Sequence, residues 1–508
     1  MERAGPTFIK LGQWAASRAD LFPASLCEQM GKLHSNGDPH SIQHTRKVIE
    51  KVFGQKFEDI FETFEEKPIG CGAIAQVYRA KLKPEMLPAS LADNTTEDGD
   101  PTTNAATNTE VAIKVLHPRA HKTIRRDIAI MSIFANIVNL FPGMEWISLP
   151  EEVAVFGEMM ESQLDLRVEA NNLDRFLANF GKRGPGIAFP QPFRLGNKEN
   201  AAASEEDQAQ VLIEEYEDAL PLKYFLRNGG GEYDDRLAKM GLDAFLVSSE
   251  LLAGENMLLI DNWTHGDLHP GNIMVRFHKP STQDFMQHLA ARIFNSKEGK
   301  ATPVTAAQNE IVYRLRAVAH DSEAWIAELD YLAGQGYEPE LIFIDAGLVT
   351  TLNTENRRNF LDLFQAVAEF DGYRAGHLMV ERCRSPELAI DPETFALKMQ
   401  HVVLSVKSKT FSLAAIKISD VLTEVLTSVR QHHVKMEGDF VNTVISILLL
   451  EGIGRQLDPN LDLFKSALPI LRQLGRQMRN TDVISQVPKG DLWAMAKVCR
   501  RSDWYSRL

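Results

Sequence analysis

The stretch His265-Gly-Asp-Leu-His-Pro-Gly-Asn272 is the most informative part of the sequence. Asp267 and Asn272 are five residues apart, and a proline and a glycine between them favour a loop. This spacing is typical of loops in which the aspartate orients an attacking hydroxyl and the asparagine binds a metal beside a nucleotide. His265 and His269 raise the alternative of a histidine-bound zinc, but the neighbouring sequence offers no third ligand. We therefore predict that this loop takes part in phosphoryl transfer.

A glycine loop upstream, Gly70-Cys-Gly-Ala-Ile-Ala-Gln-Val77, fits the pattern G-x-G-x-x-[GA]-x-V. Missing side chains let backbone N–H groups approach phosphates, and the alternating residues after the loop predict a strand. The residues expected to surround a nucleotide are Gly70, Cys71, Gly72, Ala73 and Val77. Taken by itself, the loop favours a plain glycine-rich hairpin over a nucleotide site.

The strand Val111-Ala-Ile-Lys114 supports a nucleotide-binding role for the glycine loop. A lysine at this position can reach the α and β phosphates if a carboxylate positions its ammonium group. The candidate carboxylate is Glu169, which lies four residues after Asp165 and shares its helix face. The alternatives are an edge-strand lysine in solvent and a solvated acidic helix face. We predict an ion pair between Lys114 and Glu169.

The segment Phe343-Ile-Asp-Ala-Gly-Leu348 places Asp345 after an apolar strand and before a glycine. Kinases carry a magnesium-binding aspartate at this point, so Asp345 and Asn272 are the predicted metal ligands. The glycine loop, strand lysine, helix glutamate, catalytic loop and this aspartate follow one another in kinase order. Together they predict that the chain binds ATP (or ADP) with Mg2+, and that Asp267, Lys114 and Glu169 are the catalytic group.

Composition and charge limit the other possibilities for this chain of 508 residues. Lys and Arg number 55 against 69 Asp and Glu, and a net charge of −14 argues against a general nucleic-acid binder. The four cysteines lie far apart, which predicts free thiols and excludes a disulfide scaffold. The longest apolar run, Val444–Leu450, suits a core helix and is too short to span a bilayer.

Sequence texture divides the chain into three regions. Residues 1–60 have helical periodicity, 61–217 form a strand-rich lobe, and 218–508 form a second lobe with a mostly helical end. A polar stretch at about 84–109 predicts a flexible surface insertion, and about 279–340 is predicted as a second insertion.

With these motifs in place, the chain resembles the UbiB family of atypical kinase-like proteins, also called aarF-domain or ABC1-type kinases. The distinctive segment is Phe8-Ile-Lys-Leu-Gly-Gln13, which is similar to the family's K-x-G-Q signature. Further matches are Gln76–Ala80, Glu169-Ala170, the H-G-D-L-H-P-G-N string and Glu451–Pro459. The resemblance covers nearly the whole chain apart from the insertions.

Membership would imply an α+β, protein-kinase-like fold of two lobes with K-x-G-Q helices over the cleft, where a peptide substrate would otherwise lie. It would also imply ATP binding, a mitochondrial setting in eukaryotes with association at the inner membrane, and a role in ubiquinone or other lipid metabolism. A membrane surface or a lipid or quinone ligand is then an expected partner. The sequence leaves the oligomeric state open.

Three departures from the family pattern qualify these expectations. Gly70–Ala73 replaces the usual alanine-rich loop, so the nucleotide preference of alanine-loop members does not transfer. Gln163 stands where the family has an acid, which makes Asp165 the predicted partner of Lys10, and Lys10, Gly12, Gln13 and Asp165 form the predicted K-x-G-Q group. The chain also begins almost at the K-x-G-Q motif, without the targeting and membrane segments expected upstream.

Two rival functions remain. Small-molecule phosphotransferases of the aminoglycoside or choline kinase type share H-G-D-x-H-x-x-N but lack K-x-G-Q, so Lys10 and Gln13 favour the UbiB interpretation. A catalytically silent nucleotide-binding scaffold is the second rival, since a covering amino-terminal segment could exclude substrates.

Overall fold

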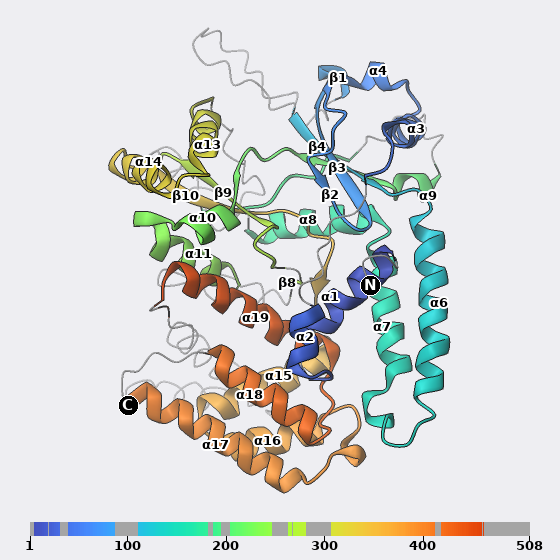
Figure 1. Cartoon of the computed structure of the whole chain (residues 1–508), viewed down its shortest axis with the longest axis vertical. Helices are drawn as coiled ribbons and strands as arrows, with labels where there is room; N and C mark the ends of the chain where they lie inside the picture. Colours follow the sequence, from blue (N-terminus) through green and yellow to red (C-terminus); the bar gives the residue numbers. More distant parts are fainter. Residues whose placement is uncertain are drawn as a thin grey trace, which may run out of the picture. The chain divides into compact units, whose positions relative to one another are not determined.

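The computed structural model describes residues 5–18, 20–30, 39–86, 110–180, 186–194, 204–245, 263–266, 268–280, 306–411, 418–459 and 461 (Figure 1). The fold is of the predicted α+β class, with a kinase-like arrangement of sheet and helices. Contacts divide the chain into two compact units. The first contains residues 1–351 and 441–461, and the second contains 352–440 and 462–508.

An antiparallel sheet forms the amino-terminal lobe of the first unit. Its strands are β1 (Phe61–Phe64), β2 (Gly70–Cys71), β3 (Ala75–Leu82), β4 (Glu110–Leu116) and β6 (Val211–Glu215), in the order β1-β3-β4-β6 with β2 paired to β3. Alternation along β4 decides what each face does: Val111, Ile113 and Val115 are fully buried on one face, while Ala112 and Lys114 lie on the other. Burying each of these branched side chains contributes about 1.5–3 kcal/mol.

Helix α3 (Ile42–Phe53), within the region 1–60 that is predicted to be helical, covers the apolar face of this sheet. The helix starts after an extended Ser41 and stops at Gly54, whose φ of 65° is the left-handed conformation that ends many helices. Ile49 is fully buried against the strands. The short α4 (Phe57–Ile60) leads into β1, and α9 (Glu205–Gln208) precedes β6. Because α3 covers the apolar face of the sheet, the Lys114 side chain lies on the opposite face, which α3 does not cover.

Two antiparallel helices, α6 (Ala120–Val138) and α7 (Leu149–Ser162), follow β4, and α8 (Leu166–Phe180) then crosses to β6 (Figure 1). The amino-terminal helix α1 (Pro6–Ser17), followed by α2 (Ala24–Met30), packs on α6 and α7. Thr7 Oγ1 donates to Asp127 at 2.8 Å, and Arg18, which is 1% exposed, forms an ion pair with Glu152 at 2.5 Å. Buried polar contacts of this kind fix the position of the K-x-G-Q helix.

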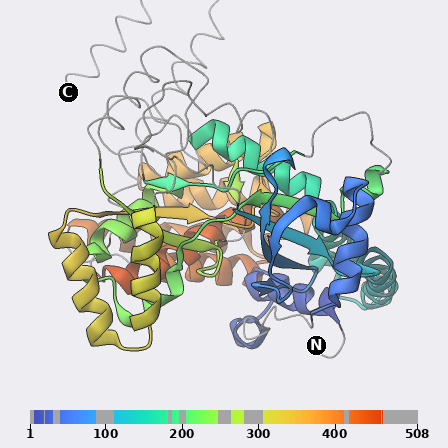
Figure 2. The ribbon, with the colours of Figure 1, turned by 90° about the horizontal axis from the view of Figure 1, so that it is seen from above.

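A second sheet has the order β5-β10-β9-β7, and Figure 2 shows it from above. Its strands are β5 (Ile187–Ala188), β7 (Leu220–Pro221), β9 (Ile273–His278) and β10 (Glu338–Phe343), while β8 (Thr264–His265) pairs with β11 (Val349–Thr350). The accompanying helices are α10 (Leu222–Asn228), α11 (Asp234–Phe245), α13 (Ala306–Val318) and α14 (Ser322–Gly334).

The segment predicted as an insertion at about 279–340 proves more regular than that prediction. From residue 306 it contains α13, α14 and the start of β10, and Trp325 and Leu329 of α14 are fully buried. This part therefore belongs to the core of the first unit. Residues 281–305, and 87–109 of the first predicted insertion, lie outside the described residues.

Helices make up the described part of the second unit, as the periodicity after Asn353 predicts. They are α15 (Thr354–Ala368), α16 (Gly372–Glu381), α17 (Pro392–Phe411), α18 (Ile418–Gln431) and the start of α19 (Gly438–Leu457). The apolar run Val444–Leu450 lies in α19 within the first unit and is a core segment, as predicted. Within the described ranges, no helix combines the length and apolarity needed to cross a membrane.

Candidate functional site

A cavity of about 570 Å³ lies in the first unit, between the glycine loop and the second sheet. Its volume is within the range of small-molecule sites. Most predicted site residues line it, namely Lys10, Gly70, Cys71, Gly72, Ala73, Val77, Lys114, Asp165, Glu169, Asn272 and Asp345. Asp267 lies outside the described residues. Segments separated by more than 300 positions in the sequence therefore meet at one cavity.

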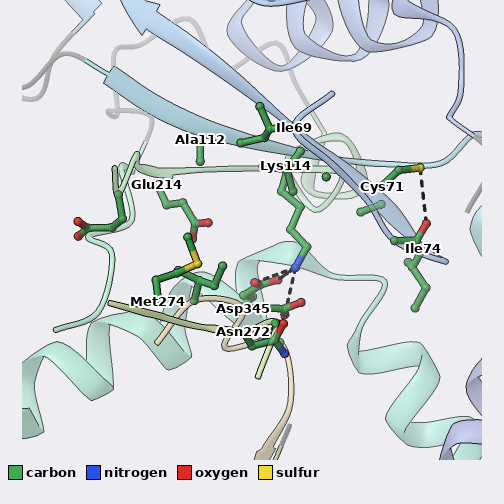
Figure 3. Close-up of a pocket in the computed structure, with 18 of the residues that line it drawn as sticks. Ile69, Cys71, Ile74, Ala112, Lys114, Glu214, Asn272, Met274 and Asp345 are labelled. Carbon is green, nitrogen blue, oxygen red and sulfur yellow. Dashed lines mark hydrogen bonds and ion pairs between the residues drawn. The ribbon is translucent and has the colours of Figure 1, made fainter. Parts of the chain in front are cut away.

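Lys114 forms the predicted ion pair with Glu169. Its Nζ lies 2.9 Å from both carboxylate oxygens of Glu169 and 3.2 Å from Oδ1 of Asp345 (Figure 3). The Lys114 side chain is 16% exposed and that of Glu169 only 4%. Burial alone would lower the pKa of Lys114, but the charges of Asp345 and Glu169 outweigh it and hold the pKa above its usual value. Lys114 is thus a fixed, charged ammonium in the cavity.

Asp345 follows β10 in a left-handed conformation with φ of 62°, which is uncommon for a residue other than glycine. The N–H of Ile344 donates to the carbonyl of Asn272 at 2.9 Å, which joins the two predicted metal ligands through the backbone. A Cβ on Gly347 would lie 3.2 Å from Asp345 Oδ1 and 3.3 Å from Glu169 Oε2, so glycine leaves room for the carboxylates.

Burial by itself would raise the pKa of Asp345, but the charges of Lys114 and Lys10 hold it well below its usual value. Asp345 is therefore an ionised carboxylate. Together with the Asn272 amide beside it in the cavity, it provides the oxygen donors that Mg2+ prefers (Figure 3). The residues present fit this ion.

The glycine loop is the hairpin between β2 and β3, in which Gly72 N–H donates to the Ala75 carbonyl at 2.9 Å. A Cβ on Gly70 would meet no atom within 4 Å, and neither Gly70 nor Gly72 has a positive φ. Neither the turn nor the packing therefore requires glycine at position 70. The missing side chain leaves space over the cavity, as expected where a ligand approaches the backbone.

Two histidines that the sequence motifs did not single out, His117 and His40, lie next to the glycine loop, and His117 contacts its backbone. His117 Nε2 lies 3.0 Å from the Gly72 carbonyl oxygen and must carry the hydrogen in that contact, because the carbonyl can only accept. His117 Nδ1 lies 2.7 Å from Nδ1 of His40, and His40 Nε2 lies 2.9 Å from Thr45 Oγ1. Burial and the neighbouring His117 and His44 lower the pKa of His40 to about 4. His40 is consequently neutral at physiological pH.

The K-x-G-Q helix contributes Lys10 to the cavity, but the predicted partner of Lys10 is wrong. The Asp165 carboxylate is bound by Arg167, with Nε to Oδ1 at 2.9 Å and Nη2 to Oδ2 at 2.8 Å. Arg167 is only two residues away, and its planar guanidinium group matches both oxygens of a carboxylate. The Asp165 side chain is therefore already paired with Arg167. Lys10 instead acts on Asp345, whose pKa it lowers. Gly12 is buried in α1 and Gln13 is half-buried.

Glu214 is one of the cavity residues that the motif analysis missed, together with Glu215, Glu217 and Arg316. It is 7% exposed, and its Oε2 is buried without a hydrogen-bond partner in the described part of the chain. Burial and the charges of Glu169 and Asp345 raise its pKa to about 8 against the opposing effect of Lys114. The available signal was an acid inside the otherwise apolar strand Val211–Glu215.

Comparison with known proteins agrees with this geometry. The family model described as the ABC1 atypical kinase-like domain matches residues 32–86 and 102–292, and the UbiB helical domain matches 408–462. A mitochondrial ABC1 family protein of Saccharomyces cerevisiae is 44% identical over 94% of this chain and 67% of its own length. The chain belongs to the ABC1/UbiB atypical kinase family. This confirms the resemblance drawn from the K-x-G-Q segment and the catalytic loop.

Other relatives extend the comparison. A mitochondrial ABC1 family protein of Schizosaccharomyces pombe is 42% identical over 97% of this chain and 66% of its own length. The probable serine/threonine-protein kinase abkC of Dictyostelium discoideum is 31% identical over 92% of this chain and 63% of its length. The chain thus spans about two thirds of the length of these curated relatives. Its kinase-like domain implies nucleotide binding, and its yeast relatives are mitochondrial.

Proposed function

We propose that the chain binds ATP or ADP with Mg2+ and acts as an atypical kinase or ATPase. The observation that carries the proposal is the position of Lys114, held between Glu169 and Asp345 at the wall of the cavity. A buried ammonium fixed by two carboxylates can contact phosphates without reorganisation when a nucleotide arrives. The open space at Gly70 and the oxygen donors Asp345 and Asn272 support the same proposal.

Each residue then has a defined task. Lys114 contacts the α and β phosphates, and Glu169 keeps its ammonium in place. Asp345 and Asn272 would hold Mg2+, which, when bound, neutralises charge on the phosphates. Asp267 would orient the attacking hydroxyl or water and accept its proton. These assignments follow the kinase order of the motifs, and they are proposals for each residue.

The direct test measures binding separately from turnover. Mg2+-dependent binding of a fluorescent ATP analogue and release of phosphate are followed for the full chain, for Asp345→Asn and for Asp267→Asn. We expect Asp345→Asn to lose metal-dependent binding, and Asp267→Asn to bind normally but turn over at least a hundredfold more slowly. Glu110→Gln, on β4 but outside the cavity lining, is the matched control. Unchanged binding and hydrolysis in both site variants would refute the proposal.

Generic protein substrates are not expected to be phosphorylated. The K-x-G-Q helix α1 is fixed on α6 and α7 and brings Lys10 to the cavity, where an extended peptide would need room. ATP binding with no labelling of added peptides is the expected result. Robust peptide phosphorylation, or phosphorylation of choline or amino sugars, would favour a rival kinase class.

We further propose a mitochondrial role in ubiquinone or other lipid metabolism, in which the chain meets an anionic membrane surface. The yeast relatives described as mitochondrial support the location. One face of α6 and the turn after it supports the surface contact, because six large apolar side chains there are 52–83% exposed, namely Ile130, Ile133, Phe134, Ile137, Leu140 and Phe141. Residues 128–144 contain no charged side chain.

Charge on α6 favours an anionic lipid surface as the contact. In the first half of the helix, Arg125 and Arg126 are more than two-thirds exposed, where Arg125 pairs with Glu161 of α7 and Arg126 with Asp127, the only acid of α6, which is 3% exposed. A basic segment that continues into an apolar face is typical of helices that lie in the lipid headgroup region.

Vesicle sedimentation tests this contact. The full chain should sediment with vesicles that contain phosphatidylglycerol more than with pure phosphatidylcholine vesicles. The double change Ile133→Ser and Phe134→Ser should weaken binding about tenfold or more, since each side chain contributes on the order of 1.5 kcal/mol when buried. Leu397→Ser, 55% exposed in the second unit, is the control. Equal lipid binding by the double variant would contradict the proposal. A dimeric wild type that the double change makes monomeric, with no effect on lipid binding, would assign this face to a contact between copies and contradict it too.

A further inference from the structure

Glu214 lies on the strand face that lines the cavity. In the register of β4 and β6, Glu214 is opposite Ala112, and Lys114 is opposite Leu212. Because Ala112 and Lys114 are two residues apart, they share one face of the sheet, and cross-strand partners share that face too. Figure 3 shows Glu214 beside Ala112, with Met274 below it on the opposite wall.

The Glu214 carboxyl has an unmet hydrogen-bonding capacity. Its Oε2 is buried and makes no hydrogen bond among the described residues, although the residue is 7% exposed. An unpaired buried polar atom is costly, and in a native protein it calls for an explanation. Burial and the nearby carboxylates raise the pKa of Glu214 to about 8, which favours the protonated carboxyl group. Such a group can donate one hydrogen bond and accept another.

The surroundings of Glu214 define the shape of a partner. Lys114 and Asp345 occupy the polar part of the cavity, where phosphates are proposed to bind. Apolar side chains, including those of Ile69, Val77, Ala112 and Met274, line the same cavity, and Glu215, Tyr216 and Glu217 follow Glu214 along its wall. Apolar walls of this kind suit a flat aromatic ring, and Ala112, opposite Glu214 in the sheet register, adds only a methyl group beside the carboxyl.

We propose that Glu214 selects the nucleobase, accepting a hydrogen bond from the 6-amino group of adenine through its unpaired carboxyl oxygen. Adenine presents an amino donor next to a ring-nitrogen acceptor, which is the complement of a neutral carboxyl group. A purine without the amino group leaves the buried oxygen unpaired, and sites built for a hydrogen bond reject such analogues strongly. This inference rests on the proposed nucleotide binding and adds a specificity-determining residue to it.

The test compares ATP with purine riboside triphosphate, which lacks the 6-amino group, by competition against a fluorescent nucleotide on the full chain with Mg2+. Wild type should prefer ATP by about tenfold or more, a factor equal to about 1.4 kcal/mol. Glu214→Met should lose most of this preference by binding ATP more weakly. Glu214→Gln, whose amide oxygen still accepts the hydrogen bond, should keep it. Melting temperatures of the variants establish that they fold.

Glu110→Gln is again the matched control, because Glu110 lies on β4, pairs with Arg79 at 2.7 Å and does not line the cavity. It should keep the wild-type preference. Equal affinity of wild type for both nucleotides, or an unchanged preference in Glu214→Met, would overturn the assignment while leaving the proposed function intact. Failure of wild type to bind any triphosphate would refute the proposed function and this inference with it.

Discussion

Removing the Lys114 charge should destabilise the amino-terminal lobe far more than removing the Glu169 charge. With Lys114→Met, the Glu169 carboxyl group, which is only 4% exposed, loses its cation and is left beside Asp345, which already raises its pKa. With Glu169→Met, Lys114 keeps Asp345 at 3.2 Å, and that carboxylate is 47% exposed. The two halves of one ion pair are therefore not equivalent, because the remaining partner differs in each variant.

The magnitude follows from the geometry. At 2.9 Å and an effective dielectric constant of about 20, the attraction between Lys114 and Glu169 is about 6 kcal/mol before desolvation is subtracted. Breaking a buried pair from one side typically costs about 3–5 kcal/mol, and we expect Lys114→Met to fall in this range. Glu169→Met should cost about 1–2 kcal/mol because Asp345 remains. The double variant should be more stable than Lys114→Met, since two apolar side chains replace the pair.

Amide hydrogen exchange is the suitable assay, because a chain with two compact units need not unfold in a single step. Opening free energies are compared for peptides from β4 and α8. Lys81→Met, which breaks an exposed pair with Glu62 on the same sheet, is the control and should cost less than about 1 kcal/mol. The reasoning would be refuted if the two single variants lost equal opening free energy and the loss in the double variant equalled their sum.

Three further predictions concern other parts of the chain. Arg18→Met removes the ion pairs with the buried Asp20 and Glu152 and should destabilise the contact of α1 by about 3 kcal/mol, measured as faster proteolysis near the amino terminus; unchanged proteolysis would contradict it. Because the unfolded chain protonates His40 near pH 6.5 and the folded chain only near pH 4, stability should fall as the pH drops through this window. Thermal melts should show a shallower fall for His40→Gln, by about 1 kcal/mol after allowance for its partial exposure, and equal slopes would exclude this role. Gly376→Ala should destabilise the α16–α17 pair by about 1–3 kcal/mol, since its Cβ would lie 2.6 Å from Ala396 Cα, whereas Gly334→Ala meets open space; similar melting temperatures would contradict it.

The motif order was sufficient to predict which distant segments form the site. The ion pair between Lys114 and Glu169 could be predicted because a strand lysine that binds phosphates needs a carboxylate, and the kinase order names the helix that carries it. A helix such as α3 within residues 1–60 was also predictable, because apolar spacing and the glycine at its end are local signals. The roles of Asp345, Asn272 and Asp267 stay predictions until the binding experiments are done.

Partner choice among charged side chains was not predictable in the same way. Asp165 was assigned to Lys10, but Arg167 lies two residues away and binds both oxygens of Asp165. Lys10 instead exerts its charge on Asp345. Helix periodicity identifies which residues share a face, but it does not determine which of several cationic side chains forms an ion pair with a given carboxylate.

The sequence by itself determined the family, the order of the elements and most of the residues that line the cavity, because these depend on local patterns and on spacing. Only the tertiary structure decided that Oε2 of Glu214 is buried without a hydrogen-bond partner among the described residues, that His117 contacts the Gly72 carbonyl, and that the helices after residue 306 belong to the core. The physical reason is that burial and hydrogen bonding depend on what packs against a residue from remote parts of the chain. An acid inside a strand is solvated or buried according to the strand beside it, and that neighbour is chosen by the fold as a whole.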